Sequence, residues 1–292
     1  MDYINRVSFK QMLLSYKKRP LSLLLRILVI LSTLTAVCSL VFLVVYVIIK
    51  GVPYLTPEIF SLEYNSDNVS MLPAIINTLL MTVLSLVIAA PIGIFSAIYL
   101  VEYAKRGNKL VSIIRITAET LTGIPSIVYG LFGMLFFVSA LGFGYSLLSG
   151  AFTLAIMILP VIMRTTEEAL LAVPDSYREG SFGLGAGKLR TVFKIILPSA
   201  VPGILSGVIL ATGRVVGETA ALIFTAGTVA KVPTSIFSST RTLAVHMYSL
   251  SKEGLHTNQA YATAVVLLII VIIINTISDL IASRLSKMSG ER

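Results

Sequence analysis

Charged residues are scarce in this chain of 292 amino acids, and their scarcity indicates its class. Asp, Glu, Lys and Arg make up 13% of the residues, against about 25% in soluble domains, whereas hydrophobic residues make up 56%. A chain with so few charges cannot cover a water-facing surface, and the same numbers exclude intrinsic disorder. The composition therefore indicates an integral membrane protein.

Residues that support disulfide, metal or hydrolytic chemistry are nearly absent. Cys38 is the only cysteine, so no intrachain disulfide can form. His246 and His256 are the only histidines, and they have neither metal-ligand spacing nor a nucleophile partner. The sequence therefore predicts that the chain is not an enzyme and holds no metal or cofactor of its own.

Long apolar stretches are abundant. A helix needs about 20 apolar residues to cross the hydrocarbon layer. Six stretches reach this length: about 21–49, 71–101, 112–140, 146–172, 200–226 and 260–284. Because open strand edges cannot be satisfied in lipid, these stretches predict helices. The expected fold class is therefore an all-α integral membrane protein with about six transmembrane helices.

The spans suggest a simple organisation. Residues 1–20 form a cytoplasmic tail, either an interfacial helix or a solvated segment. Residues 21–49 form the first transmembrane helix, and residues 70–285 form the main transmembrane domain with a long loop over 174–199. Residues 286–292 form a second cytoplasmic tail.

Positive charges fall mainly on one side of the predicted spans. Eighteen of the 23 Lys and Arg residues lie in or beside the two tails and the loops after the second and fourth spans, with Arg26, Arg115, Arg164 and Arg284 counted at the adjoining helix ends. Four lie on the opposite side, and Arg214 lies inside a span. Since cytoplasmic loops carry the excess of Lys and Arg, both termini are expected in the cytoplasm.

A few charged residues lie within the predicted spans, where each costs at least about 2.5 kcal/mol. Arg214 and Glu218, four residues apart, are expected to share one helix face of the fifth span. Glu119 lies in the third span and Arg164 in the fourth. One interpretation is a polar path whose arginines meet an anion, because a guanidinium matches phosphate or carboxylate oxygens. The alternatives are an Arg214–Glu218 ion pair that fixes helix packing, snorkelling of Arg164 to the cytoplasmic surface, and an interhelical hydrogen bond of Glu119.

The loop over 174–199 is the one long stretch on the predicted cytoplasmic side. Asp175 or Ser176 can cap a short helix, and the glycines around Gly185 allow a sharp turn. A second, basic helix is expected to run to Leu197-Pro198. The pattern predicts a helix–turn–helix beneath the membrane, and its position between two spans argues against nucleic-acid binding.

The Gly187-Lys188 pair in this loop does not predict a nucleotide site. A P-loop needs a glycine five residues before Gly-Lys and a Ser or Thr after it, but Phe182 and Leu189 occupy these positions. ATP hydrolysis, where it is used, must therefore come from a separate chain.

The same loop resembles the signature of ABC importer permeases. That signature is a Glu-Ala-Ala-like triplet, three residues, a glycine, nine residues and Ile-x-Leu-Pro. Here Glu179-Gly180-Ser181 occupies the triplet, Gly185 follows after three residues, and Ile195-Ile196-Leu197-Pro198 follows after nine more. The triplet differs from the family at its second and third positions, whereas the spacing and the Leu-Pro pair are intact.

Two other segments are similar to the phosphate-specific (Pst) permeases of this family. They are GIPSIVYGLFG at 123–133 and GRVVGETAA at 213–221. The run LIFTAG at 222–227 and the short N-terminal tail favour the PstA branch over the PstC branch. The resemblance extends over about residues 70–285.

The resemblance implies a type I ABC importer permease fold with a cytoplasmic coupling helix at about Tyr177–Gly185. It implies three kinds of protein partner: a paralogous permease PstC, an ATPase dimer PstB that binds ATP and Mg, and a phosphate-binding protein PstS. The expected function is to form half of a phosphate pathway in a bacterial or archaeal cell (inner) membrane, in contact with lipid and without nucleic acid.

The resemblance also assigns roles to residues. Arg214, Glu218 and Arg164 would lie on or near the phosphate route, with Glu119 as a further polar group of the path. The residues expected to couple the chain to the ATPase are Tyr177, Arg178, Glu179, Gly180, Ser181, Gly185, Leu197 and Pro198.

Two alternatives stay open from the sequence. An ABC permease for sulfate, molybdate or an organic anion would keep the same fold and kinds of partner. A self-contained ion-coupled transporter would use Arg214, Glu218 and Glu119 as a proton relay and would need no ATPase.

Overall fold

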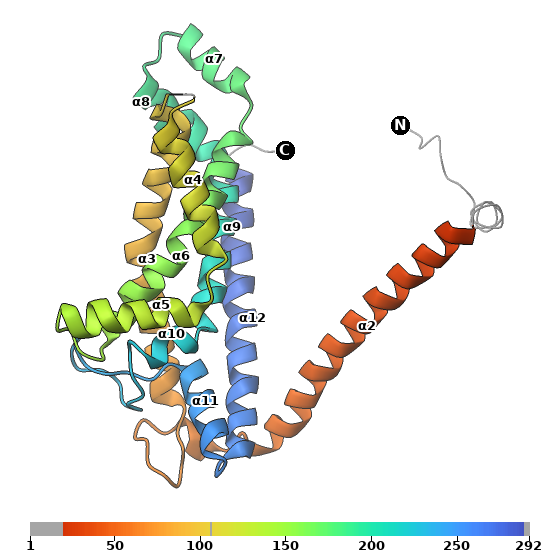
Figure 1. The fold of residues 1–292 in the computed structure, drawn as a ribbon, viewed down its shortest axis with the longest axis vertical. Coiled ribbons are helices and arrows are strands. Elements are labelled where there is room, and N and C mark those ends of the chain that lie inside the picture. Colours follow the sequence, from red (N-terminus) through yellow and green to blue (C-terminus); the bar gives the residue numbers. More distant parts are fainter. Residues whose placement is uncertain (1–19, 106, 289–292) are drawn as a thin grey trace. The chain divides into compact units, whose positions relative to one another are not determined.

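The computed structural model describes residues 20–105 and 107–288, and every regular element within them is a helix (Figure 1). The expected all-α fold is therefore confirmed for the described part of the chain. The proposed interfacial helix in the N-terminal tail falls on residues 1–19, which lie outside the described residues.

The N-terminal unit, which ends at Lys50, contains almost all of helix α2, Pro20–Gly51. Its 32 residues span about 48 Å at 1.5 Å per residue, enough to cross a bilayer. Its apolar side chains are exposed within this unit, which suits surroundings of lipid or protein.

The second unit contains all the other elements, which are 3₁₀, α or π in type. They are η1 (Val52–Tyr54), η2 (Pro57–Phe60), α3 (Leu72–Ile98), η3 (Tyr99–Tyr103), α4 (Lys109–Thr122), α5 (Ser126–Gly133), η4 (Met134–Ala140), α6 (Leu147–Leu171), α7 (Asp175–Gly183), α8 (Lys188–Thr191), η5 (Val192–Ile196), α9 (Leu197–Val216), α10 (Ala220–Ile223), α11 (Leu243–Glu253) and α12 (Thr257–Met288). Helix α12 therefore extends into the predicted tail at 286–292.

Five helices among the described residues are long and apolar enough to cross a membrane, or six when one bent pair is counted as a span. The bent pair corrects the prediction of a single span over 112–140, because α4 meets α5 and η4 at 104°. Pro125 lacks an N–H and disfavours helical backbone at Ile124, so the helix ends there. The Tyr129 hydroxyl donates to the carbonyl of Leu121 at 2.7 Å and satisfies one of the backbone groups that the bend releases.

The predicted span 200–226 is also displaced. The helical segment begins at Lys188, passes through the π turn η5, and ends at Val216. Gly217 ends α9, so the residues that follow leave the helix and form the short α10.

Helices α3, α6 and α9 pack around the main core. On α9, Gly207 lies against α6 so closely that a β-carbon there would be 2.7 Å from Cβ of Thr165. Gly203, one turn earlier, lies against Ala169. This Gly-x-x-x-Gly spacing lets two membrane helices approach closely. The largest fully buried side chains include Met81, Leu154, Met157, Ile158, Ile162 and Leu222.

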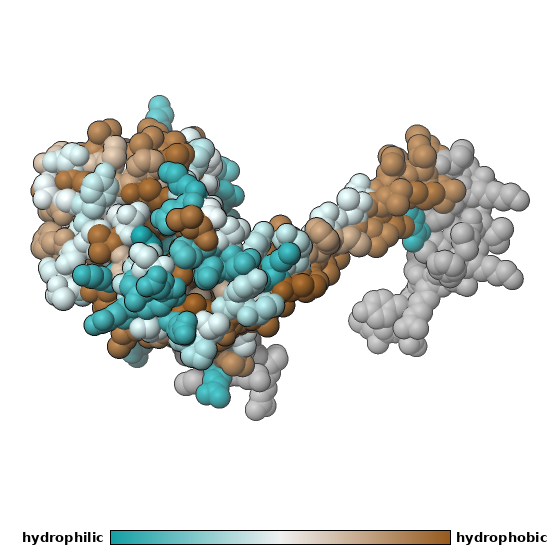
Figure 2. Space-filling model, turned by 90° about the horizontal axis from the view of Figure 1, so that it is seen from below, coloured by the Kyte–Doolittle hydropathy of each residue, from teal (hydrophilic) through white to brown (hydrophobic). Residues whose placement is uncertain are grey.

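The segment between α10 and α12 includes α11. It is fastened to α3 by two buried polar side chains. Asn77 donates through Nδ2 to the carbonyls of Lys231 and Arg241, and the Thr78 hydroxyl accepts from the Leu243 amide at 2.8 Å. Figure 2 views the molecule from the α11 end, and hydrophilic residues gather on this face.

His246 on α11 is fully buried. Its Nδ1 lies 3.4 Å from Nη1 of Arg241, and its ring meets Tyr64 edge-on at 6.0 Å. Burial, and next the charge of Arg241, lower the pKa of His246 from 6.5 to about 4, while a backbone hydrogen bond at Val69 acts in the opposite direction. The imidazole is therefore neutral at physiological pH.

This burial predicts acid sensitivity. As pH falls below 6.5, the unfolded chain binds a proton at His246 before the folded chain does, so stability is present above this pH and is lost down to pH 4. We expect the free energy of unfolding to fall by up to about 1.4 kcal/mol per pH unit in this window. Thermal unfolding of purified protein would measure it. His246→Gln should flatten the dependence; equal slopes in both proteins would contradict the prediction.

Candidate translocation and coupling site

A cluster of charged side chains bridges α4 and α6. Arg115 on α4 pairs with Glu167 on α6 at 2.5 Å, and Arg164 on α6 pairs with Glu119 on α4 at 3.4 Å. Arg164 also pairs with Glu168 one turn along its own helix at 3.1 Å. The same five residues line a cavity of about 240 Å³. The structure thus brings together Arg164 and Glu119, which the sequence places in different spans.

This cluster contains three carboxylates and two guanidinium groups. Both arginines are neutralised by acids, so the cluster by itself does not attract an anion. Arg164 and Glu119 remain largely exposed, with 51% and 69% of their side chains accessible. The arrangement suits a polar surface between helices, in which Arg164 pairs with Glu119 and Glu168.

Arg214 differs from these arginines. It lies half-buried in the last turn of α9, where a positive charge is favoured by the helix dipole. Within the described part of the chain it forms no ion pair and no hydrogen bond. The phenol of Tyr129 lies within electrostatic range of its guanidinium. Arg214 therefore keeps its donors available.

Glu218 does not share a helix face with Arg214, and this part of the sequence interpretation is wrong. Helix α9 ends at Val216, and Glu218 lies in the break before α10. Its carboxylate is buried, and Oε1 accepts a hydrogen bond from the Ala221 amide at 3.0 Å. Glu218 thus accepts a hydrogen bond from a backbone amide in the first turn of α10 and does not pair with Arg214.

A glycine explains how α5 reaches this break. A β-carbon on Gly130 would lie 2.8 Å from Cα of Ala221, so only glycine allows α5 and α10 to approach this closely. The two segments that resemble Pst permeases therefore pack against each other. They place Tyr129, Arg214 and Glu218 in one region of the fold.

The expected coupling helix is present as α7, which is followed by a turn at Gly185. Gly185 has φ of +81°, a left-handed conformation that favours glycine. Pro174 precedes the helix, and neither Asp175 nor Ser176 caps it as expected. The helix–turn–helix ends in α8, which continues through η5 into α9 instead of stopping at Leu197-Pro198.

The predicted coupling residues divide by exposure. Tyr177, Glu179, Gly180 and Gly185 are exposed, whereas Leu197 and Pro198 are half-buried within the long helix. Ser181 is buried, and its hydroxyl lies 2.8 Å from that of Thr191 on α8. This contact links α7 to α8 across the turn.

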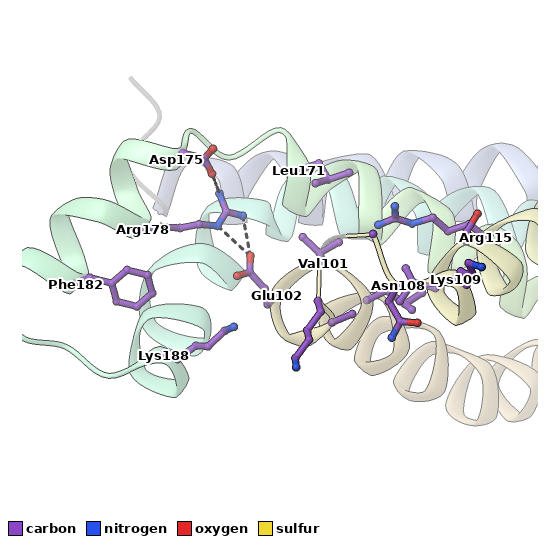
Figure 3. Close-up of a pocket in the computed structure, with 16 residues that line it drawn as sticks. Val101, Glu102, Asn108, Lys109, Arg115, Leu171, Asp175, Arg178, Phe182 and Lys188 are labelled. Atoms are coloured by element: carbon purple, nitrogen blue, oxygen red, sulfur yellow. Dashed lines mark hydrogen bonds and ion pairs between the residues drawn. The ribbon is translucent and has the colours of Figure 1, made fainter.

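Arg178 faces the membrane helices rather than solvent (Figure 3). Its Nη2 and Nε donate to Glu102 at 2.7 and 3.1 Å. Its remaining donors reach the carbonyls of Leu170 and Val173 at the end of α6 and the carboxylate of Asp175. The arginine therefore links the coupling helix to the ends of α3 and α6.

Glu102 was not predicted from the sequence. It lies in the π turn η3 at the end of α3, and only 8% of its side chain is accessible. Its one available signal was an acidic residue directly after a long apolar stretch. The pair borders a cavity of about 1030 Å³ that also includes Lys105, Lys109 and Lys188.

Helical spans, a polar break and an exposed turn define a multi-pass membrane permease. The family described as "Binding-protein-dependent transport system inner membrane component" matches residues 89–288, and the chain belongs to this family. It is thus an inner-membrane permease subunit of an ABC importer, whose ATPase is a separate chain. This membership excludes the self-contained ion-coupled transporter.

Relatives support the same class. The chain is 36% identical over 225 residues to the "Probable ABC transporter permease protein YqgI" of Bacillus subtilis, covering 72% of this chain and 76% of that protein. It is 41% identical over 212 residues to the "Phosphate transport system permease protein PstA" of Pasteurella multocida, covering 72% of this chain and 74% of that protein.

Solved structures show a similar fold. A bacterial alginate ABC transporter in complex with its periplasmic protein gives a TM-score of 0.68 at 15% identity over 93% of this chain and 98% of that chain. The MetNI methionine ABC transporter gives a TM-score of 0.57 at 21% identity, over 74% of this chain and 94% of that chain. The expected type I importer permease fold is therefore confirmed.

The Glu102–Arg178 pair predicts a non-additive stability effect. Arg178→Met should lower the free energy of unfolding by about 3–5 kcal/mol, because it leaves the buried Glu102 carboxylate unpaired. Glu102→Gln should cost less, because Arg178 keeps the carboxylate of Asp175 and the carbonyls of Leu170 and Val173. The double variant should lose less than the sum. Thermal unfolding of the purified chain measures all three. Asp175→Asn, which removes an exposed partner of the same arginine, should cost at most about 1 kcal/mol. Additive losses would show that the two groups do not interact.

Proposed function

We propose that this chain is the PstA-type permease subunit of an ATP-driven importer for inorganic phosphate. The observation that carries the proposal is Arg214, a half-buried guanidinium in a spanning helix that has no acidic partner among the described residues. An intramembrane charge without a partner is costly and marks an ion pathway by default. Its planar donors match phosphate oxygens.

The break beside Arg214 supports a pathway role. Glu218 forms no ion pair with Arg214 among the described residues, and its Oε1 accepts from the amide of Ala221. The helix break exposes backbone at a place where irregular structure is tolerated when it lines a cavity. Phosphate would meet Arg214 transiently, because conduction requires release as well as binding. Arg164 and Glu119 then form a polar wall of the route.

The proposal includes a division of labour among four kinds of chain. A PstC permease forms the other half of the pathway, and PstS delivers phosphate from the outer side. A PstB dimer binds ATP and Mg and grips α7 through its exposed residues, including Tyr177 and Glu179. Dimerisation of the ATPases moves α7 and rocks the helices between outward and inward openings. Both termini lie in the cytoplasm, as the distribution of Lys and Arg favours.

Another oxyanion is the second candidate substrate. A guanidinium binds sulfate or molybdate by the same geometry, and the Bacillus subtilis relative bears only a general permease name. The identity of 41% with a phosphate permease favours phosphate.

Uptake of radiolabelled phosphate by cells that lack their own system would test the function. Wild-type chain with its partners should restore uptake, and excess sulfate or molybdate should not compete. Arg214→Gln should lower uptake about 10- to 100-fold, since a hydrogen bond to a charged group contributes about 1.5–3 kcal/mol. Phosphate uptake with Arg214→Lys should lie between the uptake of the wild type and that of Arg214→Gln.

Arg284→Gln at the end of α12 is the matched control and should leave uptake unchanged. Co-purification of the ATPase should be normal in all variants. Wild-type uptake by Arg214→Gln would contradict the pathway role, and competition by sulfate would reassign the substrate.

A further inference from the structure

A second cavity lies at the α11 end of the fold, apart from the charged cluster of α4 and α6. It has a volume of about 390 Å³. Its lining combines two cations, three hydroxyl-bearing residues, one acid and one aliphatic residue: Arg241, Lys252, Thr228, Tyr248, Ser249, Glu253 and Ile223. Neither the family nor the proposed route through Arg214 assigns a role to it.

Arg241 is held in place from three directions. Its Nε donates to the carbonyl of Thr228 at 2.7 Å, and its guanidinium lies 5.4 Å from the ring centre of Tyr64. Its Nη1 lies 3.4 Å from Nδ1 of His246. Because a guanidinium only donates, this ring nitrogen accepts. The side chain is therefore fixed before any ligand arrives.

The charge of Arg241 is nevertheless not neutralised. No carboxylate in the described part of the chain lies within ion-pair distance of it, and its Nη2 makes no hydrogen bond. His246 cannot supply a negative charge. A protein that needed Arg241 only for packing would satisfy it with an acid or more carbonyls, as it does for Arg178.

The other lining residues complete a site for an oxyanion. Lys252 adds a second positive charge, and the hydroxyls of Tyr248, Ser249 and Thr228 add neutral donors. Glu253 is the only acid in the lining, so the cavity carries a net charge of +1. A guanidinium fork, an ammonium group and hydroxyl donors are all suited to bind the oxygens of a tetrahedral oxyanion.

The cavity is also next to the proposed route. Ile223, which lines it, ends α10, and the Ala221 amide near the start of the same helix is bound by Glu218. Along the chain, this four-residue helix connects the cavity lining to the break beside Arg214.

We propose that this cavity binds a tetrahedral oxyanion through Arg241 and Lys252, as a receiving site that precedes Arg214. Its assignment to inorganic phosphate rests on the proposed function. The cavity concentrates the anion at the α11 end, before it reaches the break.

Protection of lysine from an amine-reactive reagent tests occupancy directly. The reconstituted complex is labelled with and without inorganic phosphate, at ionic strength matched with chloride, and the modification of each lysine is read by mass spectrometry. By mass action, phosphate at ten times its dissociation constant should slow labelling of Lys252 about tenfold. Lys231, exposed in the same segment but outside the cavity, is the matched control and should label at an unchanged rate.

Variants identify the groups that bind. Arg241→Gln should abolish the protection of Lys252 by phosphate, and Arg241→Lys should weaken it. Lys252→Gln, an exposed substitution that should not disturb folding, should raise the external phosphate concentration for half-maximal uptake, whereas Lys231→Gln should not.

Four results would overturn the proposal. They are absence of protection, equal slowing of both lysines, protection by the binding protein whether or not it carries phosphate, and protection by anionic lipid without inorganic phosphate. The last two would assign the cavity to protein docking or to a lipid headgroup. Failure of the proposed function is separate, because it appears as absent phosphate uptake even when Lys252 is protected.

Discussion

Backbone hydrogen bonding in lipid is the constraint on which the rest of this structure depends. A helix that breaks within the membrane must find other partners for its freed N–H and C=O groups. This chain breaks twice, between α4 and α5 and between α9 and α10. At the first break the hydroxyl of Tyr129 donates to the carbonyl of Leu121, and at the second the carboxylate of Glu218 accepts from the amide of Ala221. Because Gly130 lets the two breaks approach closely, the same region becomes both irregular and polar. Such a region has the polar groups that a route for an ion requires.

The five arginines of the two candidate sites and the coupling turn divide into two groups by what surrounds them. Arg115, Arg164 and Arg178 are each matched by carboxylates or helix-end carbonyls, so they organise the packing of α4, α6 and α7. Arg214 and Arg241 have no carboxylate within ion-pair distance among the described residues. Since an unmatched guanidinium is expensive to keep, the second group is where function is expected.

Much of the fold could be predicted from the sequence, because apolar length alone identifies spanning helices. The coupling turn was also predictable, since glycine spacing before Leu197-Pro198 is a local signal. The helix breaks were not, because predominantly apolar sequence continues on both sides of Pro125 and of Gly217. Hydropathy does not reveal a change in helix direction such as the 104° bend between α4 and α5. The pairing of Glu102 with Arg178 joins residues 76 positions apart, and no local pattern encodes it.

The close approach of α9 to α6 limits which substitutions this sequence can accept during evolution. At Gly207 the neighbouring helix leaves no room for a β-carbon, because Cβ of Thr165 already occupies the space. A rotamer change moves the hydroxyl but not Cβ, so it gives no relief. A larger residue at 207 therefore requires a simultaneous change at 165 or a wider helix separation. Among homologous chains, these two positions should covary, and their joint variation would record how far apart the helices stand in each lineage.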